Sequence, residues 1–378
     1  MGVQSRQSRF FFFFFEVTYL REVAVNTQGY SEGQSSSTVQ REETFTQGVY
    51  RKMIEEVLSR ANGLRALARV EENKGSHGVD GMSVKSLRGH LVQNWPTIRE
   101  SIRKGTYRPS PVRRVEISKP NGGTRSLGIP TVTDRLIQQA ITQVLTPVFA
   151  PRFSEHSYGF RPQRRGHDAV RKARGFMQEG YRIVVDIDLE KFFDRVHHDR
   201  LMARIAERVK DKALLKLIRS YLQAGVMENG LVRATEEGTP QGGSLSPLLS
   251  NIVLDELDKE LEKRNLRFVR YADDSNIYVK TWKAGQHVMN SVVSFIERKL
   301  KLKVNQEKSV VDRPWNRKFL GFTFGMEKAK PQIRIAKPSL RRVKAKIKAM
   351  TSRSRSIPME IRMRELNQYL MGGAVITQ

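Results

Sequence analysis

The stretch Tyr271-Ala272-Asp273-Asp274 decides how the rest of this chain is interpreted, because it places two adjacent acids between two short apolar runs. Residues 268–269 lead into it and residues 277–279 lead out, so we expect a hairpin with the acids at its turn. Neighbouring carboxylates raise each other's pKa and cost stability unless water or a cation screens them. The stretch therefore predicts a Mg²⁺ site at the end of a hairpin.

The composition predicts a polyanionic partner. The 378 residues include 67 Lys and Arg against 39 Asp and Glu, which gives a formal net charge of +28. This excess is far more than solubility requires, and it predicts nucleic-acid binding that weakens steeply with salt. On charge alone, a basic protein without any chemistry remains the alternative. The absence of cysteine excludes disulfides and cysteine-ligated zinc, and no apolar run approaches the roughly 18 residues of a membrane span.

The first 48 residues differ from the rest of the chain. Six consecutive phenylalanines, Phe10–Phe15, follow a short basic leader, an order that superficially resembles a signal peptide. The apolar run is too short for that assignment, and Glu16 follows it without a small-residue cleavage site. Residues 31–38 are rich in serine and resemble a linker. We expect residues 1–48 to be a disordered leader or translation from an upstream start.

A second acidic segment lies within residues 181–194. Alternation along it predicts a strand with Ile183, Val185 and Ile187 on one face, and Asp186 and Asp188 on the other. An acid at the end of an apolar strand costs desolvation free energy unless it meets a partner or an ion. An ion pair with one of the many arginines is a credible alternative for Asp186 and a less credible one for Asp188.

Two loops have the chemistry to bind phosphate. Residues 112–125 predict a hairpin with a two-glycine tip, which Lys119 and Arg125 flank as a phosphate clamp. A hairpin made soluble by charge is the alternative. The loop 237–247 contains Gln241 within Pro-Gln-Gly-Gly and opens a predicted helix over 248–261, where backbone could approach a ligand closely. A plain loop-to-helix junction is the alternative there. A capped amphipathic helix is predicted over 133–149.

The order of acidic strand, Pro-Gln-Gly-Gly loop and Tyr-Ala-Asp-Asp hairpin resembles the palm of reverse transcriptases. In particular, residues 51–373 resemble group II intron-encoded reverse transcriptases and maturases of the compact class C type, which have no endonuclease domain. Further matching stretches are Gly78-Val79-Asp80-Gly81, Tyr107-Arg108-Pro109, Lys119-Pro120, Leu127-Gly128-Ile129-Pro130, Asp134-Arg135, Tyr158-Gly159-Phe160-Arg161-Pro162 and Phe319-Leu320-Gly321-Phe322. Each is weak alone, and together in this order they are very specific.

The resemblance implies an α+β, right-hand polymerase fold with a ferredoxin-like palm sheet packed on helices. It implies an N-terminal extension and fingers over 49–180, a palm over 181–324, and the start of a helical thumb or maturase domain over 325–378. Because thumbs of this family contain further helices, we expect a truncated thumb.

The resemblance also assigns roles to single residues. Asp188, Asp273 and Asp274 match the catalytic acids that hold two Mg²⁺ ions, and the backbone carbonyl of Leu189 resembles a further metal ligand. The residues matching the deoxynucleotide site are Lys119, Arg125, Phe193, Gln241 and Lys308, the last as a candidate proton donor to pyrophosphate. A solvent-exposed lysine without this role is the alternative for Lys308. The residues matching the primer grip are Phe319, Leu320, Gly321 and Phe322.

The function implied is that of an RNA-directed DNA polymerase, a nucleotidyltransferase that copies a mobile group II intron during retrohoming and assists its splicing. The implied partners are the intron RNA, an RNA template with a DNA primer, and dNTPs. The implied location is the bacterial cytoplasm, with the nucleoid or a ribonucleoprotein particle and without a membrane; the oligomeric state is unknown. A non-catalytic RNA-binding maturase and a truncated, inactive remnant are the alternatives.

Overall fold

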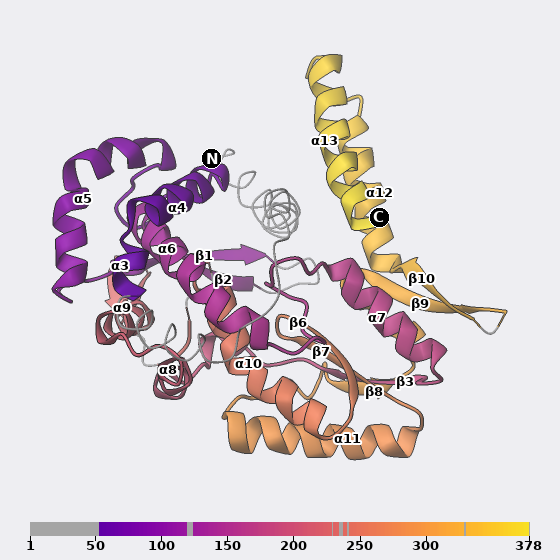
Figure 1. Cartoon of the computed structure of the whole chain (residues 1–378). Helices are drawn as coiled ribbons and strands as arrows, with labels where there is room; N and C mark the ends of the chain where they lie inside the picture. Colours follow the sequence, from indigo (N-terminus) through magenta and orange to yellow (C-terminus); the bar gives the residue numbers. More distant parts are fainter. Residues whose placement is uncertain are drawn as a thin grey trace, which may run out of the picture.

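The computed structural model describes residues 53–118, 124–228, 230–233, 237–239, 242–328 and 330–377, and Figure 1 shows their arrangement. The expected leader over residues 1–48 lies outside these ranges, and so does the tip of the first hairpin. The described chain has an N-terminal helical region with a small sheet, a central sheet between helices, and a C-terminal helical hairpin.

The N-terminal region combines helices with a mixed sheet of strand order β2-β1-β4-β5. Strands β1 and β2 pair antiparallel as predicted, and β4 joins the other edge of β1 in parallel. The elements are α3 (Met53–Val57), α4 (Arg60–Glu72), the 3-10 turn η2 (Val84–Ser86), α5 (Leu87–Arg103), β1 (Val112–Ser118), β2 (Thr124–Ile129), α6 (Val132–Phe149), η3 (Ala150–Arg152), β4 (Val226–Glu228) and β5 (Leu231–Arg233).

Helix α6 is the centre of this region. It begins one residue earlier than the predicted 133, because the Thr131 side chain accepts a hydrogen bond from the Asp134 amide and caps the helix at that point. Its apolar side chains, among them Ile137, Ile141 and Leu145, are buried against α3 and α4 in the main hydrophobic cluster. The helix predicted from the apolar period is therefore confirmed as a core element.

A buried carboxylate without a cation joins α6 to its neighbours. Asp134 is 1% exposed, and its Oδ1 accepts from the hydroxyls of Tyr107 at 2.8 Å and Tyr221 at 3.1 Å. Its Oδ2 accepts from the Thr131 hydroxyl at 2.7 Å and from the Ser110 amide at 3.1 Å. Burial raises the pKa of Asp134, while these four donors act in the opposite direction. The network ties α6 to α9 (Lys212–Leu222) and to the segment that enters β1.

The central sheet is antiparallel with strand order β6-β7-β3-β8. Its strands are β3 (Ile183–Ile187), β6 (Arg267–Tyr271), β7 (Asp274–Val279) and β8 (Val310–Asp312). Helices lie between β3 and β6 and between β7 and β8, so the succession is strand, helices, two strands, helix, strand. This succession and strand order are those of a ferredoxin-like palm, and the predicted α+β palm is therefore confirmed.

Helices cover both faces of this sheet. On one face Ile183 and Val185 join the main cluster with α10 (Ser246–Lys263) and α11 (Trp282–Phe295), which the π-helix η5 (Ile296–Leu300) extends. On the other face Val184 packs with α7 (Gly166–Gln178) in a second cluster. Figure 1 shows α11 below the sheet and α7 above it. The predicted acidic face is thus apolar at Val184, and it becomes acidic only from Asp186 onward.

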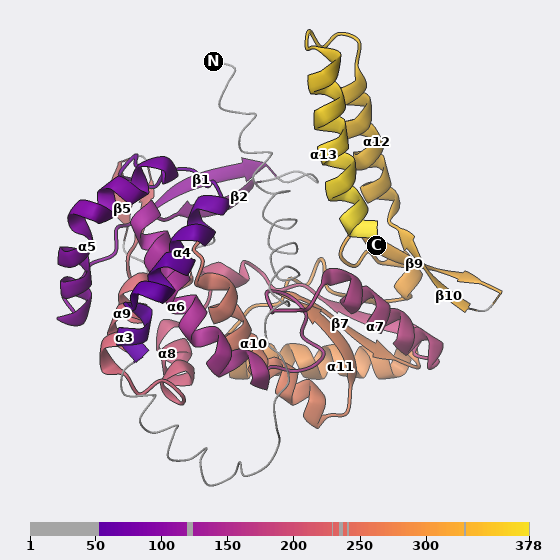
Figure 2. The ribbon, with the colours of Figure 1, turned by 45° about the horizontal axis from the view of Figure 1, so that its top comes forward.

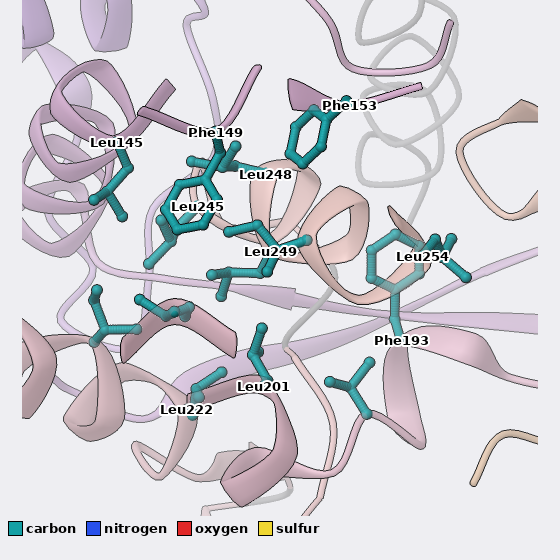
Figure 3. Packing of buried hydrophobic residues seen from close by; sticks show 14 of the residues in the cluster. Leu145, Phe149, Phe153, Phe193, Leu201, Leu222, Leu245, Leu248, Leu249 and Leu254 are labelled. Carbon is teal, nitrogen blue, oxygen red and sulfur yellow. The ribbon is translucent and has the colours of Figure 1, made fainter. Parts of the chain in front are cut away.

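Three elements within residues 192–222 pack around α10. They are the 3-10 turn η4 (Phe192–Asp194), α8 (His198–Ala206) and α9. Leucines of α8 and α9 pack with those of α10 in the main cluster (Figure 3). Helix α10 runs from 246 to 263 rather than over the predicted 248–261, because Pro247 occupies its first turn, where proline needs no amide donor.

The C-terminal region is a strand hairpin followed by a helical hairpin that extends away from the sheets (Figures 1 and 2). Its elements are the 3-10 turn η6 (Pro314–Asn316), β9 (Phe322–Glu327), β10 (Lys330–Ile335), α12 (Lys337–Thr351) and α13 (Met359–Thr377). Helix α12 contains six basic residues and no acid, and all six are exposed. Among the described residues, none of the helices has the length and hydropathy to cross a bilayer.

The Asp134 network generates a stability prediction. Tyr221→Phe and Tyr107→Phe should each lower the free energy of unfolding by about 1.5 kcal/mol, because each removes one hydrogen bond to a buried carboxylate. The double variant should lose more than the sum, since Asp134 Oδ1 then retains neither hydroxyl donor. Urea unfolding of the four proteins measures this, and an additive or smaller loss would contradict the network.

Candidate active site

The Tyr-Ala-Asp-Asp stretch forms the predicted hairpin. Tyr271 pairs with Asp274, so Ala272 and Asp273 form a two-residue turn between β6 and β7. Ala272 has a φ of 56°, a left-handed conformation that costs a residue with a Cβ roughly 1–2 kcal/mol. Asp273 is half-buried in this turn and Asp274 is exposed at the start of β7. The surrounding structure must therefore hold a strained turn that presents two like charges.

A buried arginine directly beneath the turn supplies that support. Arg270 is 0% exposed, and its Nε and Nη2 donate to the two carboxylate oxygens of Asp258 on α10 at 2.8 and 2.6 Å. Its Nη1 donates to the Ala272 carbonyl at 2.8 Å and to Asn251 Oδ1 at 3.0 Å. Its Nη2 also donates to Ser157 Oγ at 2.8 Å. All five guanidinium donors are thus satisfied, one of them by the strained turn itself.

The loop that contains the matching stretch 158–162 packs behind the same turn. The Arg270 carbonyl accepts from the Tyr158 amide at 2.8 Å, and Asn251 Nδ2 donates to the Gly159 carbonyl at 2.9 Å. A Cβ on Gly159 would lie 2.2 Å from the Ala272 nitrogen, so only glycine permits this approach of two backbones. The stretch therefore packs directly against the acidic turn and supports its conformation.

Asp188 lies immediately beyond β3, opposite Asp274 on the neighbouring strand, because Ile187 pairs with Ser275. Its amide donates to Ser309 Oγ at 3.0 Å, and its carbonyl accepts from the Asn305 amide at 2.8 Å. The segment 305–309 therefore fixes the backbone of this acid. The next residue, Leu189, continues the attachment through an isolated bridge to Val304.

Asp188 and Asp274 open into one cavity of about 450 Å³. Its other lining residues are Asp186, Glu307, Lys308, Val310, Arg317, Lys318 and Phe319. Asp273 does not line this cavity, although it adjoins Asp274 in the turn. The structure thus brings together two of the three predicted catalytic acids, with the third one residue away.

The donor chemistry of the cavity suits Mg²⁺, which prefers carboxylate oxygens. Lys308 Nζ lies 3.9 Å from Asp188 Oδ1, so a cationic group already approaches this carboxylate. Within the described ranges, no three acidic or histidine side chains are gathered as a ready metal site. Asp188 and Asp274 can therefore contribute to a metal site, and Asp273 joins them only if its side chain turns toward the cavity.

Asp186 has the ion pair that the alternative reading predicted. Arg317 Nη2 and Nε donate to Asp186 Oδ2 at 2.7 and 2.9 Å. Burial raises the pKa of Asp186, and the hydrogen bonds and charge of Arg317 oppose that rise. Asp186 therefore has an arginine partner within the lining of the cavity.

The residues predicted to bind the nucleotide are placed only in part. Phe193 is 7% exposed, contacts the Phe192 ring at a centroid distance of 5.1 Å, and shares a cluster with Leu249 and Leu254 of α10 (Figure 3). Its carbonyl accepts from the Thr239 amide at 2.6 Å, which anchors the loop that leads toward Gln241. Lys119, Gln241 and the side chain of Arg125 lie outside the described part of the chain, so their roles stay predictions.

The predicted primer grip is a tight turn beside the cavity. The amides and carbonyls of Phe319 and Phe322 exchange hydrogen bonds of 2.8 and 2.9 Å. Leu320 and Gly321 between them have φ values of 50° and 89°, as a type I′ turn requires. The Gly321 carbonyl accepts from the Ala336 amide at 3.0 Å, so the turn is also attached to the start of α12.

Sequence reasoning missed the residues that support the acids, above all Arg270, Asp258 and Arg317. A signal for Asp258 was present, because it lies on the apolar stripe of α10 between Leu254 and Leu261, where an acid needs a buried cation. Arg270 gave a similar signal, since it is a charged residue within an apolar strand. Nothing in the sequence indicates which of the many arginines would meet Asp186.

Comparisons with known proteins found a matching family, relatives and structural neighbours. The family model described as "Reverse transcriptase (RNA-dependent DNA polymerase)" matches residues 117–324. Protein YkfC of Escherichia coli (strain K12) is 33% identical over 296 residues, which cover 68% of this chain and 78% of that protein. Among solved structures, apo telomerase from Candida tropicalis has a TM-score of 0.49 at 14% identity, covering 76% of this chain and 56% of that chain.

An intron-encoded protein also matches. The group II intron-encoded protein LtrA of Lactococcus lactis subsp. cremoris is 40% identical over 206 residues, which cover 54% of this chain and 34% of that protein. The match therefore spans about a third of the length of this relative.

The close approach of Gly159 to the turn generates a second prediction. Gly159→Ala should lower the free energy of unfolding by about 1–3 kcal/mol, because the new methyl group forces two backbones apart. Gly175→Ala is the matched control, since nothing lies within 4 Å of the added carbon in the last turn of α7. The control should gain about 0.5–1 kcal/mol from helix propensity. Equal effects of the two substitutions in urea unfolding would refute the packing argument.

Proposed function

The chain belongs to the reverse transcriptase (RNA-dependent DNA polymerase) family, and on that premise we propose that it is the RNA-directed DNA polymerase of a group II intron. The observation that supports the proposal most directly is the meeting of Asp188 and Asp274 in one cavity, from neighbouring strands inside the matched region. In this proposal residues 49–180 form the N-terminal extension and fingers, residues 181–324 the palm, and residues 325–378 part of a thumb.

The proposed reaction is in-line phosphoryl transfer. The 3′-hydroxyl of the primer gives its proton to water, and its oxygen forms a bond to the α-phosphorus of a dNTP. The bond between that phosphorus and the oxygen that bridges to the β-phosphate breaks, and pyrophosphate leaves. Two Mg²⁺ ions, when bound, would supply charge stabilisation for the attacking and leaving oxygens. Asp188, Asp273 and Asp274 are proposed to hold them, with the Leu189 carbonyl as a further ligand.

The other cavity residues have roles at the two ends of the reaction. The ammonium of Lys308 lies close enough to Asp188 to act near the reacting phosphates. We propose that it donates the proton that neutralises the leaving pyrophosphate. Lys119 and Arg125 are proposed to hold the triphosphate, and Gln241 to contact the nucleotide. Phe193 is proposed to form the floor under the sugar from its buried position, which would favour deoxynucleotides. The turn 319–322 is proposed to hold the primer end.

The intron RNA and the template-primer duplex are the proposed partners. The net charge of +28 and the six exposed basic residues of α12 support binding to nucleic-acid backbone. The same surface favours a second candidate function, that of an RNA-binding maturase that assists splicing without polymerisation. The two functions depend on different residues, so single substitutions separate them.

The first test of the polymerase is Asp273→Asn. With poly(rA) template and oligo(dT) primer, wild type should extend the primer and the variant should lose about 100-fold or more in rate, because it lacks one metal-binding carboxylate. Glu297→Gln, an exposed acid on η5, is the matched control and should keep the wild-type rate.

Splicing of the intron RNA by the same proteins separates the candidates. We expect Asp273→Asn to retain RNA binding and splicing. If wild type promotes splicing but extends no primer at any Mg²⁺ concentration, the maturase alone is the function. If Asp273→Asn extends primers as well as wild type, the assignment of the acids is wrong.

A salt titration tests the basic surface. Three basic residues lie on one side of α12, namely Arg341, Lys344 and Lys348. Replacing all three by alanine should make the negative slope of log affinity against log salt less steep by about 2. Alanine at Arg298 and Lys299, which are exposed on η5, should leave the slope unchanged. Filter binding of an RNA hairpin between about 50 and about 300 mM KCl measures this slope. The range brackets ~0.1 M, where salt screens surface charges. An unchanged slope in the triple variant would show that α12 is not part of the surface that binds RNA.

A further inference from the structure

The ion pair between Asp186 and Arg317 joins β3 to the segment that precedes the turn 319–322, within the lining of the cavity. Asp186 is on β3, the inner strand between β7 and β8, where it pairs with Asn276 and Val310. Arg317 lies in the segment between η6 and the turn 319–322. Both side chains line the cavity, and their exposed fractions are 20% for Asp186 and 31% for Arg317. The pair is thus shielded enough to have a preferred geometry, and it faces the proposed reaction.

The same guanidinium holds a third segment. Its Nη2 donates to the Lys308 carbonyl at 3.3 Å in addition to Asp186. The segment 305–309 is in turn bonded to the backbone of Asp188 through Ser309 Oγ and the Asn305 amide. Arg317 therefore joins the strand that leads to Asp188, the segment that presents Lys308, and the segment that enters Phe319.

The backbone of Arg317 is fixed from the other side. Its carbonyl accepts from the Thr323 hydroxyl at 2.9 Å, and its amide donates to the Pro314 carbonyl at 3.2 Å. Thr323 lies in β9, directly after the turn 319–322. Because the backbone of Arg317 is bonded to β9 and to η6, its side chain links these elements to Asp186 on β3.

From this arrangement we propose that Asp186 and Arg317 are a positioning pair, which sets the primer-side turn 319–322 and the Lys308 segment at a fixed distance from Asp188. The inference rests on the proposed polymerase function and adds two residues to it. Neither residue is assigned to touch a reacting atom. The pair acts through Phe319, Lys308 and Asp188, which are its neighbours in the cavity wall.

The size of the effect follows from the geometry of in-line transfer. A displacement of about 1 Å between attacking oxygen and phosphorus costs on the order of 10²-fold in rate. The dNTP would be held mainly on the fingers side, so its binding should change little when the primer-side wall moves. A positioning role therefore predicts a loss in the rate of bond formation without a matching loss in nucleotide affinity.

Single-nucleotide addition with enzyme in excess over primer-template tests the pair. Arg317→Gln and Asp186→Asn should each lower the rate constant by about 10–100-fold while the dNTP concentration at half-maximal rate changes less than about threefold. The double variant should be no slower than the slower single variant, because the two residues act as one unit. Arg317→Lys should recover part of the rate, since it keeps the charge but cannot bridge Asp186 and the Lys308 carbonyl together.

Arg334→Gln is the matched control. Arg334 also forms an ion pair, with Glu327 at 3.8 Å, but both partners are more than half exposed on the hairpin β9–β10. This variant should keep the wild-type rate. The inference is wrong if Arg317→Gln keeps the wild-type rate, if rate and nucleotide affinity fall together, or if the losses of the two single variants multiply in the double variant.

Hydrogen exchange separates failure of this inference from failure of the proposed function. The Phe319 amide donates to Phe322 and the Asn305 amide donates to Asp188, and both should exchange about tenfold faster in Arg317→Gln with global stability unchanged. If wild type extends no primer, the proposed function fails, and this measurement still decides whether the pair fixes the two segments. Unchanged exchange at both amides would overturn the inference.

Discussion

The buried ion pair between Arg270 and Asp258 is the interaction on which the rest of the site depends. Both side chains are 0% exposed, and the arginine also bonds to the turn, to α10 and to the loop 154–161. Taking two charges out of water is expensive, and the cost is recovered only because every donor of the guanidinium has an acceptor. Removing either partner would leave an unpaired buried charge, which costs roughly 3–5 kcal/mol.

This pair explains how a strained turn can present adjacent acids. Ala272 adopts a left-handed conformation whose carbonyl is held by Arg270, and Gly159 lets the loop backbone pack directly on the turn. The surrounding contacts offset the free-energy cost of the strained backbone and of the repulsion between the two acids. These contacts fix the turn at the end of β6 and β7, where the strand register places Asp274 opposite Asp188.

The wall that carries Asp188 is held by different contacts. Asp188 follows an inner strand, and its backbone is held by Ser309 and Asn305, which lie more than 100 residues further along the chain. The half-buried pair of Asp186 and Arg317 adds a second attachment to the same wall. One wall thus depends on a fully buried network and the other on contacts that reach the cavity surface.

Much of the fold could be predicted from the sequence, because the strands and helices follow hydrophobic period and local caps. The alternation in residues 183–189, the capped helix after Thr131 and the hairpin at 271–274 are local patterns of this kind. The hydrophobic period assigns a side chain to one face of an element but does not identify its ion-pair partner. The roles of Arg270, Asp258 and Arg317 were therefore not predicted. For the same reason the predicted acidic face of β3 proved apolar at Val184, where α7 covers it. The joint placement of Asp188 and Asp274 could be predicted only from family resemblance, because it depends on pairing between distant strands.

The central claim is that Asp188, Asp273 and Asp274 hold the metal ions for phosphoryl transfer. The most direct measurement is anomalous diffraction from crystals of the protein with Mn²⁺, a dideoxy-terminated primer on an RNA template, and the matching dNTP. We expect two anomalous peaks about 3.5–4 Å apart between Asp188 and the acidic turn, with Asp273 turned toward them. Peaks bound elsewhere, or none within reach of Asp188 and Asp274 in a fully occupied complex, would contradict the claim.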